Sequence, residues 1–150
     1  MPETIGYMIT WTTYGSWLQG DKRGFVKNRK ILPENESLAN INIQNLVKNP
    51  VRLSKTHRQA TANAIIEEAK QLNQKIYALS VSSNHIHLVA GYIPIPIGTV
   101  VTHYKNAAQV ALRKIGLSGR IWTKGFDKRY CFDKESLRRR IDYVNAHNQK

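Results

Sequence analysis

The sequence has few acidic residues, and this shortage narrows the kinds of partner it can bind. Its 150 residues include 23 lysines and arginines but only 10 aspartates and glutamates, so the net charge is +13 and the isoelectric point is near 10.1. Such a balance favours a polyanionic partner, most simply a nucleic acid, over a merely soluble basic protein.

Cysteine and long apolar runs are also scarce. The single cysteine, Cys131, excludes an intrachain disulfide and a cysteine-based zinc site. No stretch approaches the roughly 18 apolar residues of a membrane span. The opening residues carry Glu3 and no basic residue ahead of the apolar stretch, which is not a signal-peptide pattern. We therefore expect one domain over residues 1–150, in the cytoplasm and without membrane contact.

Hydrophobic periodicity and turn residues predict seven elements in the order β-α-β-β-α-β-α. Ser54 and Asp133 are expected to cap helices, and Gly116 to end one. This order predicts an α+β fold, a ferredoxin-like antiparallel sheet with the helices packed on one face. The expected strands are 5–15, 76–82, 85–92 and 128–132, the expected helices are 54–75, 99–115 and the segment after 133, and 16–40 is expected to be a long exposed connection.

Two histidines stand one residue apart in the strand-like run "SNHIHLV". Residues i and i+2 of a strand point to the same face, so the imidazoles of His85 and His87 lie side by side and resemble two-thirds of a metal site. The alternative is that both are polar residues on a solvated strand face. Taken alone, the pattern favours that alternative.

The last predicted helix carries Tyr143 and His147, which share a face because they are four residues apart. His147, or in its place Asn148 or Gln149, would complete a facial ligand set with His85 and His87. With phosphate oxygens and water also bound, Mg²⁺ or Mn²⁺ is a reasonable ion for that set. Tyr143 would then lie beside the metal, where a tyrosine can attack phosphorus. For an isolated tyrosine, packing in the core is the stronger interpretation.

These residues give the chain a resemblance to the single-tyrosine HUH transposases, which include insertion-sequence transposases and their REP-associated relatives. The His-hydrophobic-His motif is "HIH" at 85–87, and the tyrosine with a ligand one turn later is Tyr143 with His147. The flanking runs "TWTTYGSWLQGDKRGFV" (10–26) and "RIWTKGFDKRYCFDKESLRRRIDYV" (120–144) are also similar to the family. The chain departs from it in having histidine as third ligand and in ending soon after the tyrosine helix.

The resemblance implies a metal-dependent reaction on single-stranded DNA, often beside a hairpin. Tyr143 would cleave one strand, leaving a 5′-phosphotyrosine and a free 3′-OH, and a second 3′-OH would reverse the step. We also expect a homodimer as one possible state, with the tyrosine acting within one subunit or across two. Two other functions stay open, a nickase related to replication initiators and a nucleic-acid-binding module with an inactive site.

Basic side chains are placed where a DNA partner could use them, and phosphate contacts of this kind raise affinity without reading sequence. Unpaired bases could also stack on Trp11, Trp17 or Trp122, although core packing is the alternative for Trp11 and Trp122 and is the preferred interpretation of Trp11. The predicted DNA-binding residues are Lys22, Arg23, Lys27, Arg120, Lys124, Lys128, Arg129, Arg138 and Arg139.

Overall fold

The computed structural model describes residues 3–16 and 50–148, and the predicted elements lie there within a few residues of the expected bounds. Most of the expected 16–40 connection, with Trp17, Lys22, Arg23 and Lys27, lies outside the described residues. The elements are β1 (Gly6–Thr12), α3 (Lys55–Leu72), β2 (Ile76–Val81), β3 (His85–Gly91), α4 (Ile97–Lys114), β4 (Asp127–Cys131) and α5 (Lys134–His147).

The four strands form one antiparallel sheet in the order β2-β3-β1-β4, which confirms the predicted ferredoxin-like fold. The central strands β1 and β3 are buried on both faces, apart from the half-buried His85. The register pairs Thr10 of β1 with His87 and Thr12 with His85. Residues directly opposite each other point to the same face, so these four side chains lie together.

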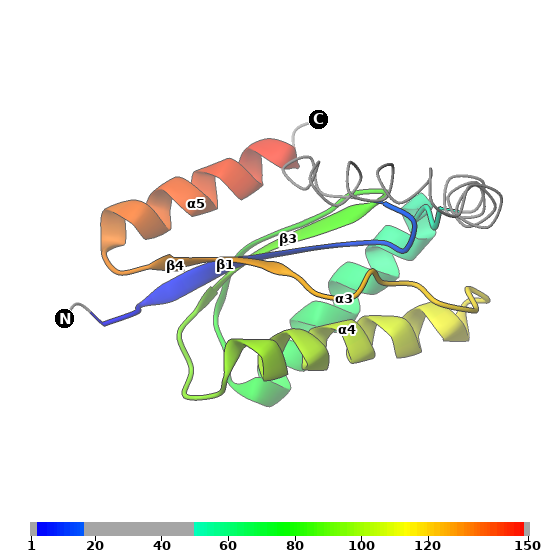
Figure 1. The fold of residues 1–150 in the computed structure, drawn as a ribbon, viewed down its shortest axis with the longest axis horizontal. Coiled ribbons are helices and arrows are strands. Elements are labelled where there is room, and N and C mark those ends of the chain that lie inside the picture. Colours follow the sequence, from blue (N-terminus) through cyan, green and yellow to red (C-terminus); the bar gives the residue numbers. More distant parts are fainter. Residues whose placement is uncertain (1–2, 17–49, 149–150) are drawn as a thin grey trace, which may run out of the picture.

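Helices α3 and α4 cover one face of the sheet, and their packing makes the larger core (Figure 1). The β1 side chains Tyr7, Ile9 and Trp11 point into this core, as period-two alternation requires. From β3 the core takes Ile86 and Leu88, the neighbours of the two histidines. The apolar residues of the motif therefore anchor β3 from the side opposite His85 and His87.

Helix α5 lies on the other face of the sheet, so the expectation that all helices share one face was wrong (Figure 1). The reason is that this face is also apolar: Met8 and Val89 need a cover, and Leu137 and Val144 of α5 supply it. Because Gly6 of β1 has no side chain, Leu137 of α5 and the backbone of β3 can lie close to it. A Cβ atom at Gly6 would lie 2.8 Å from the Ala90 carbonyl oxygen and 3.0 Å from Leu137.

The helix ends follow the sequence closely. Ser54 caps α3 in a capping box in which its hydroxyl accepts from the backbone N–H of His57 and the His57 ring accepts in return, both at 3.2 Å. Asp133 caps α5 by accepting from the N–H of Ser136 at 2.7 Å. Gly116 follows α4 with φ of +96°, a conformation that favours glycine. No helix in the described part of the chain is both long and apolar enough to span a bilayer.

Two of the tryptophans considered for base stacking belong to the core. Trp11 and Trp122 are 1% and 7% exposed, and their rings meet edge to face at 6.0 Å. Trp122 also donates its indole N–H to the Lys105 carbonyl at 3.0 Å. Neither ring is available to an unpaired base, so core packing, which was the preferred interpretation of Trp11 and the alternative for Trp122, is confirmed for both.

Candidate metal and nucleophile site

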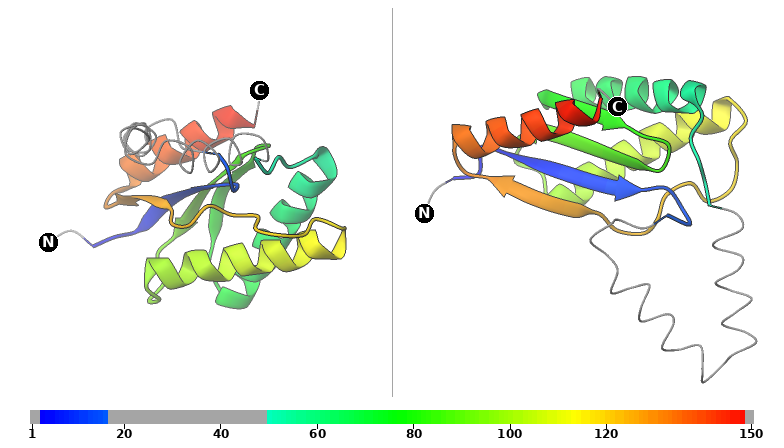
Figure 2. Two further views of the ribbon diagram at one scale, coloured as in Figure 1. Left: turned by 45° about the vertical axis from the view of Figure 1, so that its right-hand side comes forward. Right: turned by 90° about the horizontal axis from the view of Figure 1, so that it is seen from above.

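The two motif histidines lie under the C-terminal end of α5. They leave β3 on the face that α5 covers, and this end of the helix lies next to β2 and β3 (Figure 2). His87 is only 7% exposed and His85 is half-buried. The interpretation of both as polar residues on a solvated face is therefore wrong.

His147 meets the two strand histidines from the last turn of α5. The ring centroid of His147 lies 4.6 Å from that of His87 and 6.0 Å from that of His85, and the His85 and His87 centroids are 4.7 Å apart. Each histidine offers a ring nitrogen, and the three nitrogens all lie within 4.8 Å of one another. The three imidazoles are therefore close enough to one another to share one metal ion.

Hydrogen bonds at Nδ1 orient the three rings. His147 Nδ1 lies 3.0 Å from the Tyr143 carbonyl oxygen, and His85 Nδ1 lies 2.8 Å from Asn84 Oδ1. Both oxygens can only accept, so Nδ1 carries a proton in these rings, and in the neutral form of each ring Nε2 keeps its lone pair. His87 Nδ1 lies 2.8 Å from Thr10 Oγ1, an arrangement that allows the same assignment.

The site keeps its strand histidines neutral. Burial, then the neighbouring His85 and His147, lower the pKa of His87 to about 4. Burial, then His147, lower the pKa of His85. Neutral imidazole is the form that binds metal, so both rings are ready to coordinate at neutral pH.

These pKa shifts make the metal-free protein less stable in mild acid. Because folding lowers the pKa of His87, the unfolded chain binds the proton more readily, and stability is lost as pH falls through about 6.5 toward 4. We expect the free energy of unfolding of the wild-type protein, measured by urea denaturation, to fall as the pH is lowered over this range. In His87→Gln the dependence of that free energy on pH should be weaker, by up to about 1.4 kcal/mol per pH unit. An equal dependence of stability on pH in the wild-type protein and in His87→Gln would contradict the lowered pKa of His87.

Tyr143 stands at the rim of this cluster. Its ring centroid is 4.6 Å from that of His147 and 5.5 Å from that of His87, and the side chain is 42% exposed. The buried residue of this turn is its neighbour Val144. The exposure argues against Tyr143 as a core residue, and it leaves the phenol open to a ligand from solvent.

Asn148, one of the alternatives to His147 as third ligand, uses its side chain in a hydrogen bond to β2 instead. Its side-chain amide donates to the Leu79 carbonyl at 3.1 Å and ties the end of α5 to β2. Gln149 lies outside the described residues. Among the described residues, the only group of three or more ligating side chains is His85, His87 and His147.

Two residues that support the site were missed from the sequence. Asn84 directly precedes the motif, and its polar side chain beside His85 was a visible signal. Thr10 had no signal, because the β1 residue that faces His87 depends on the strand register. Thr10 is only 3% exposed, and its hydroxyl fixes the His87 ring through the hydrogen bond at Nδ1.

Thr10 is expected to tune metal affinity without touching the ion. Thr10→Val keeps the shape but removes the oxygen at His87 Nδ1, and loss of such a supporting hydrogen bond typically weakens metal binding 10–100-fold. Thr10→Ser keeps the oxygen and should bind nearly as well as the wild-type protein. Calorimetric titration with Mn²⁺ measures the difference, and similar affinities for the Val and Ser variants would exclude the role.

The donor set fits a divalent ion. Three imidazoles suit transition metals better than Mg²⁺, which prefers oxygen, and no carboxylate from the described residues joins the group. Of the two ions predicted, the protein side chains alone therefore favour Mn²⁺ over Mg²⁺, and Mg²⁺ would depend on oxygens from water and phosphate.

The predicted DNA-binding residues within the described chain are exposed but do not form one row. Lys128 and Arg129 point to opposite faces of the edge strand β4, and Arg129 pairs with Asp127 at 3.4 Å. Arg138 and Arg139 lie in the first half of α5, about 13 Å along the helix from His147 at 1.5 Å per residue. The remaining two, Arg120 and Lys124, lie between α4 and β4, where the Arg120 guanidinium covers the Tyr14 ring at 4.6 Å.

Solved structures with this fold include transposases. The protein is similar to a REP-associated tyrosine transposase that was solved bound to a REP hairpin, with 16% sequence identity and a TM-score of 0.56. The match covers 96% of this chain and 67% of the transposase chain. A protein of Deinococcus radiodurans R1 that is named as a transposase shares 13% identity and a TM-score of 0.54, over 98% of this chain and 93% of the other. No protein-family model and no curated protein sequence matches the chain. The structural likeness shows that the chain has a tyrosine transposase-like fold.

Proposed function

We propose that this protein is a metal-dependent transposase or endonuclease that cleaves and rejoins single-stranded DNA through a covalent 5′-phosphotyrosine. The observation that carries the proposal is the meeting of three histidines and an exposed tyrosine at the end of α5. The three histidines alone, or the exposed tyrosine alone, would be weak evidence. Together, on a fold shared with tyrosine transposases, they assemble the parts that strand cleavage needs.

In this proposal His85, His87 and His147 hold Mg²⁺ or Mn²⁺ through Nε2, while Thr10 and Asn84 fix the ring orientations. The bound ion would polarise the scissile phosphate and neutralise its developing charge. His87 itself transfers no proton in this proposal, since burial keeps it neutral and its Nδ1 is engaged with Thr10.

Tyr143 is the proposed nucleophile. Its phenol loses a proton to solvent, and the oxygen forms a bond to phosphorus. The bond between phosphorus and the 3′ oxygen breaks, and that oxygen takes up a proton to become a free 3′-OH. Because the Tyr143 ring lies 5.5 Å from His87 of the same chain, nucleophile and ligands can come from one subunit. A homodimer is then not required for cleavage.

The proposed substrate is a single strand beside a hairpin. The solved transposase with this fold is bound to a REP hairpin, and the net charge of +13 suits a polyanion. Incubation of the protein with Mn²⁺ and a labelled, hairpin-flanked strand tests the proposal directly. A protein–DNA adduct that survives denaturation is expected, together with a free 3′-OH fragment, and no adduct with either metal would refute it.

Binding to this strand should weaken steeply with salt and exceed binding to plain duplex. Each phosphate contact on a single strand contributes about −0.7 to the slope of log affinity against log salt. Arg138→Gln is expected to reduce that slope by one such step, measured by fluorescence anisotropy. Lys70→Gln is the control, because Lys70 is also exposed to solvent, lies on α3 and pairs with Glu67. Equal slopes for both variants would remove Arg138 from the contact set.

A further inference from the structure

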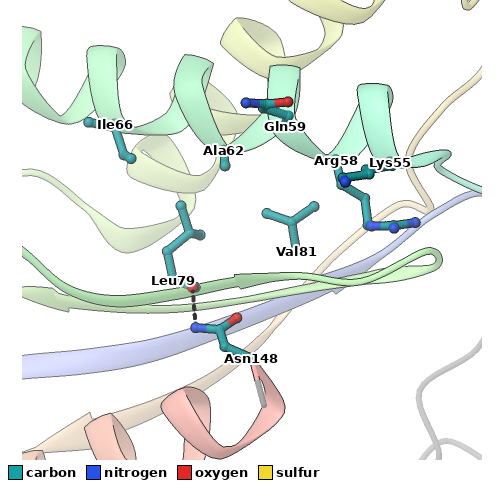
Figure 3. Close-up of a pocket in the computed structure, with 8 residues that line it drawn as sticks. All are labelled: Lys55, Arg58, Gln59, Ala62, Ile66, Leu79, Val81 and Asn148. Carbon is teal, nitrogen blue, oxygen red and sulfur yellow. Dashed lines mark hydrogen bonds between the residues drawn. The ribbon is translucent and has the colours of Figure 1, made fainter. Parts of the chain in front are cut away.

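An open groove of about 450 Å³ runs beside the edge strand β2 (Figure 3). The β2 residues that line it pair with Ile86 and Leu88, so the groove lies on the opposite side of the sheet from the histidines. Its apolar walls are Ala62 and Ile66 of α3 on one side and Leu79 and Val81 of β2 on the other. Ile66 is 43% exposed, a large fraction for an isoleucine on a packed helix. The groove therefore presents apolar surface to solvent, and its size suits a small flat group.

The groove is connected to the histidine site through the end of α5. Asn148 lines the groove and is the residue next to His147, and its amide holds the Leu79 carbonyl at 3.1 Å across the edge of β2. Ser80, between Leu79 and Val81, pairs with His87 on the other face. A DNA chain that passes from the histidines to the groove has only the edge strand β2 to go around, because β2 is the direct neighbour of β3.

The polar residues of the groove are cationic or amide, and none is acidic. Lys55 and Arg58 stand at one end, and Arg58 is held by donation from Nη1 to the Leu53 carbonyl at 2.8 Å. Gln59 and Asn148 provide amides that can both donate and accept. Apolar walls suit the faces of a base, amides suit its edge, and the two cations suit a phosphate.

We propose that this groove holds one unpaired nucleobase of the DNA strand that enters the histidine site, with an adjoining phosphate on Lys55 and Arg58. The inference rests on the proposed function and extends it, because it makes the groove the place where bases next to the cleavage point are read. A hairpin stem is too wide for the groove, so the occupant belongs to the unpaired flank.

The test uses the whole protein and a hairpin oligonucleotide in which each unpaired flanking base is replaced in turn by an abasic site. In the wild-type protein, one position should lose roughly tenfold in affinity when its base is removed, the effect of one stacked base. Ala62→Leu fills the groove, so it should bind the intact strand roughly tenfold more weakly, and removal of that same base should then have no further effect. Ile66→Ala, which removes one wall, should show the same loss in part.

The control for the added bulk is Ala111→Leu, since Ala111 is also a half-buried helical alanine but lies on α4, away from the groove. The control for charge is Lys114→Gln, compared with Lys55→Gln. The groove inference is overturned if the loss of affinity at each abasic position is the same in the wild type, in Ala62→Leu and in Ile66→Ala. It is also overturned if Ala111→Leu weakens binding as much as Ala62→Leu and Lys114→Gln as much as Lys55→Gln. The proposed function then stands as long as the adduct forms. If the wild-type protein neither binds an unpaired strand nor forms the adduct, the proposed function fails together with the groove inference.

Discussion

Replacement of Tyr143 by phenylalanine is expected to abolish the covalent protein–DNA adduct while DNA binding persists. The change removes one oxygen from a side chain that is 42% exposed, so the free energy of unfolding should change by no more than about 0.5 kcal/mol. The nucleophile, however, is lost completely, and no weaker remainder of the reaction is expected. A labelled hairpin-flanked strand, denaturing electrophoresis and mass spectrometry of the attached peptide measure the result.

Tyr130→Phe is a closely matched control. Tyr130 is 43% exposed, but it pairs with Tyr7 and therefore points to the face of the sheet opposite the histidines. Tyr104 of α4 is fully buried and donates to Gln74, and burial raises the pKa of its phenol, so it is no alternative nucleophile. An adduct on Tyr130, or undiminished adduct in Tyr143→Phe, would refute the assignment of the nucleophile.

His85→Ala is expected to slow adduct formation on the order of a thousandfold, the effect of losing several kcal/mol of metal stabilisation of the transition state. His85 is the ligand of choice for this test because it is half-buried, whereas truncation of the buried His87 would also leave a cavity. Calorimetry with Mn²⁺ should show weaker binding in the same variant, and chelation of metal should reduce the wild-type protein to a similarly low rate.

His103→Ala separates this effect from a general loss of histidine. His103 is exposed on α4, where its ring lies 3.8 Å from the Glu68 carboxylate, far in the fold from the α5 face of the sheet. It should retain the wild-type rate and metal affinity. Full activity of His85→Ala, or activity that withstands complete removal of metal, would show that the three histidines do not form a catalytic metal site.

The same assay on the wild-type protein, with an acceptor strand added, separates the functions that the sequence left open. A binding module with an inactive site would retain hairpin affinity and give no adduct even in the wild-type protein. A nickase would give the adduct but would not join the cleaved strand to a second 3′-OH. A transposase gives both the adduct and the joined product, so one labelled acceptor strand distinguishes all three.

The order and bounds of the elements could be predicted from the sequence because they depend on local interactions. Ser54, Asp133 and Gly116 act within one turn of their own helices, and the alternation of "HIHLV" is a property of any strand. For the same reason the pairing of His85 with His87 on one face needed no tertiary structure. Net charge is a sum over the chain, so the excess of basic residues on which the polyanion prediction depends was also visible at once.

The tertiary structure decided everything that depends on which surfaces meet. The sequence allowed His147, Asn148 or Gln149 as third ligand, and only the docking of α5 on the second apolar face of the sheet brought His147 to the other two histidines and turned Asn148 toward β2. The choice of Thr10 required the register of β1 against β3, which a shift of one residue would reverse. The low pKa of His87 followed from burial under α5, a contact between segments almost sixty residues apart that no local pattern encodes.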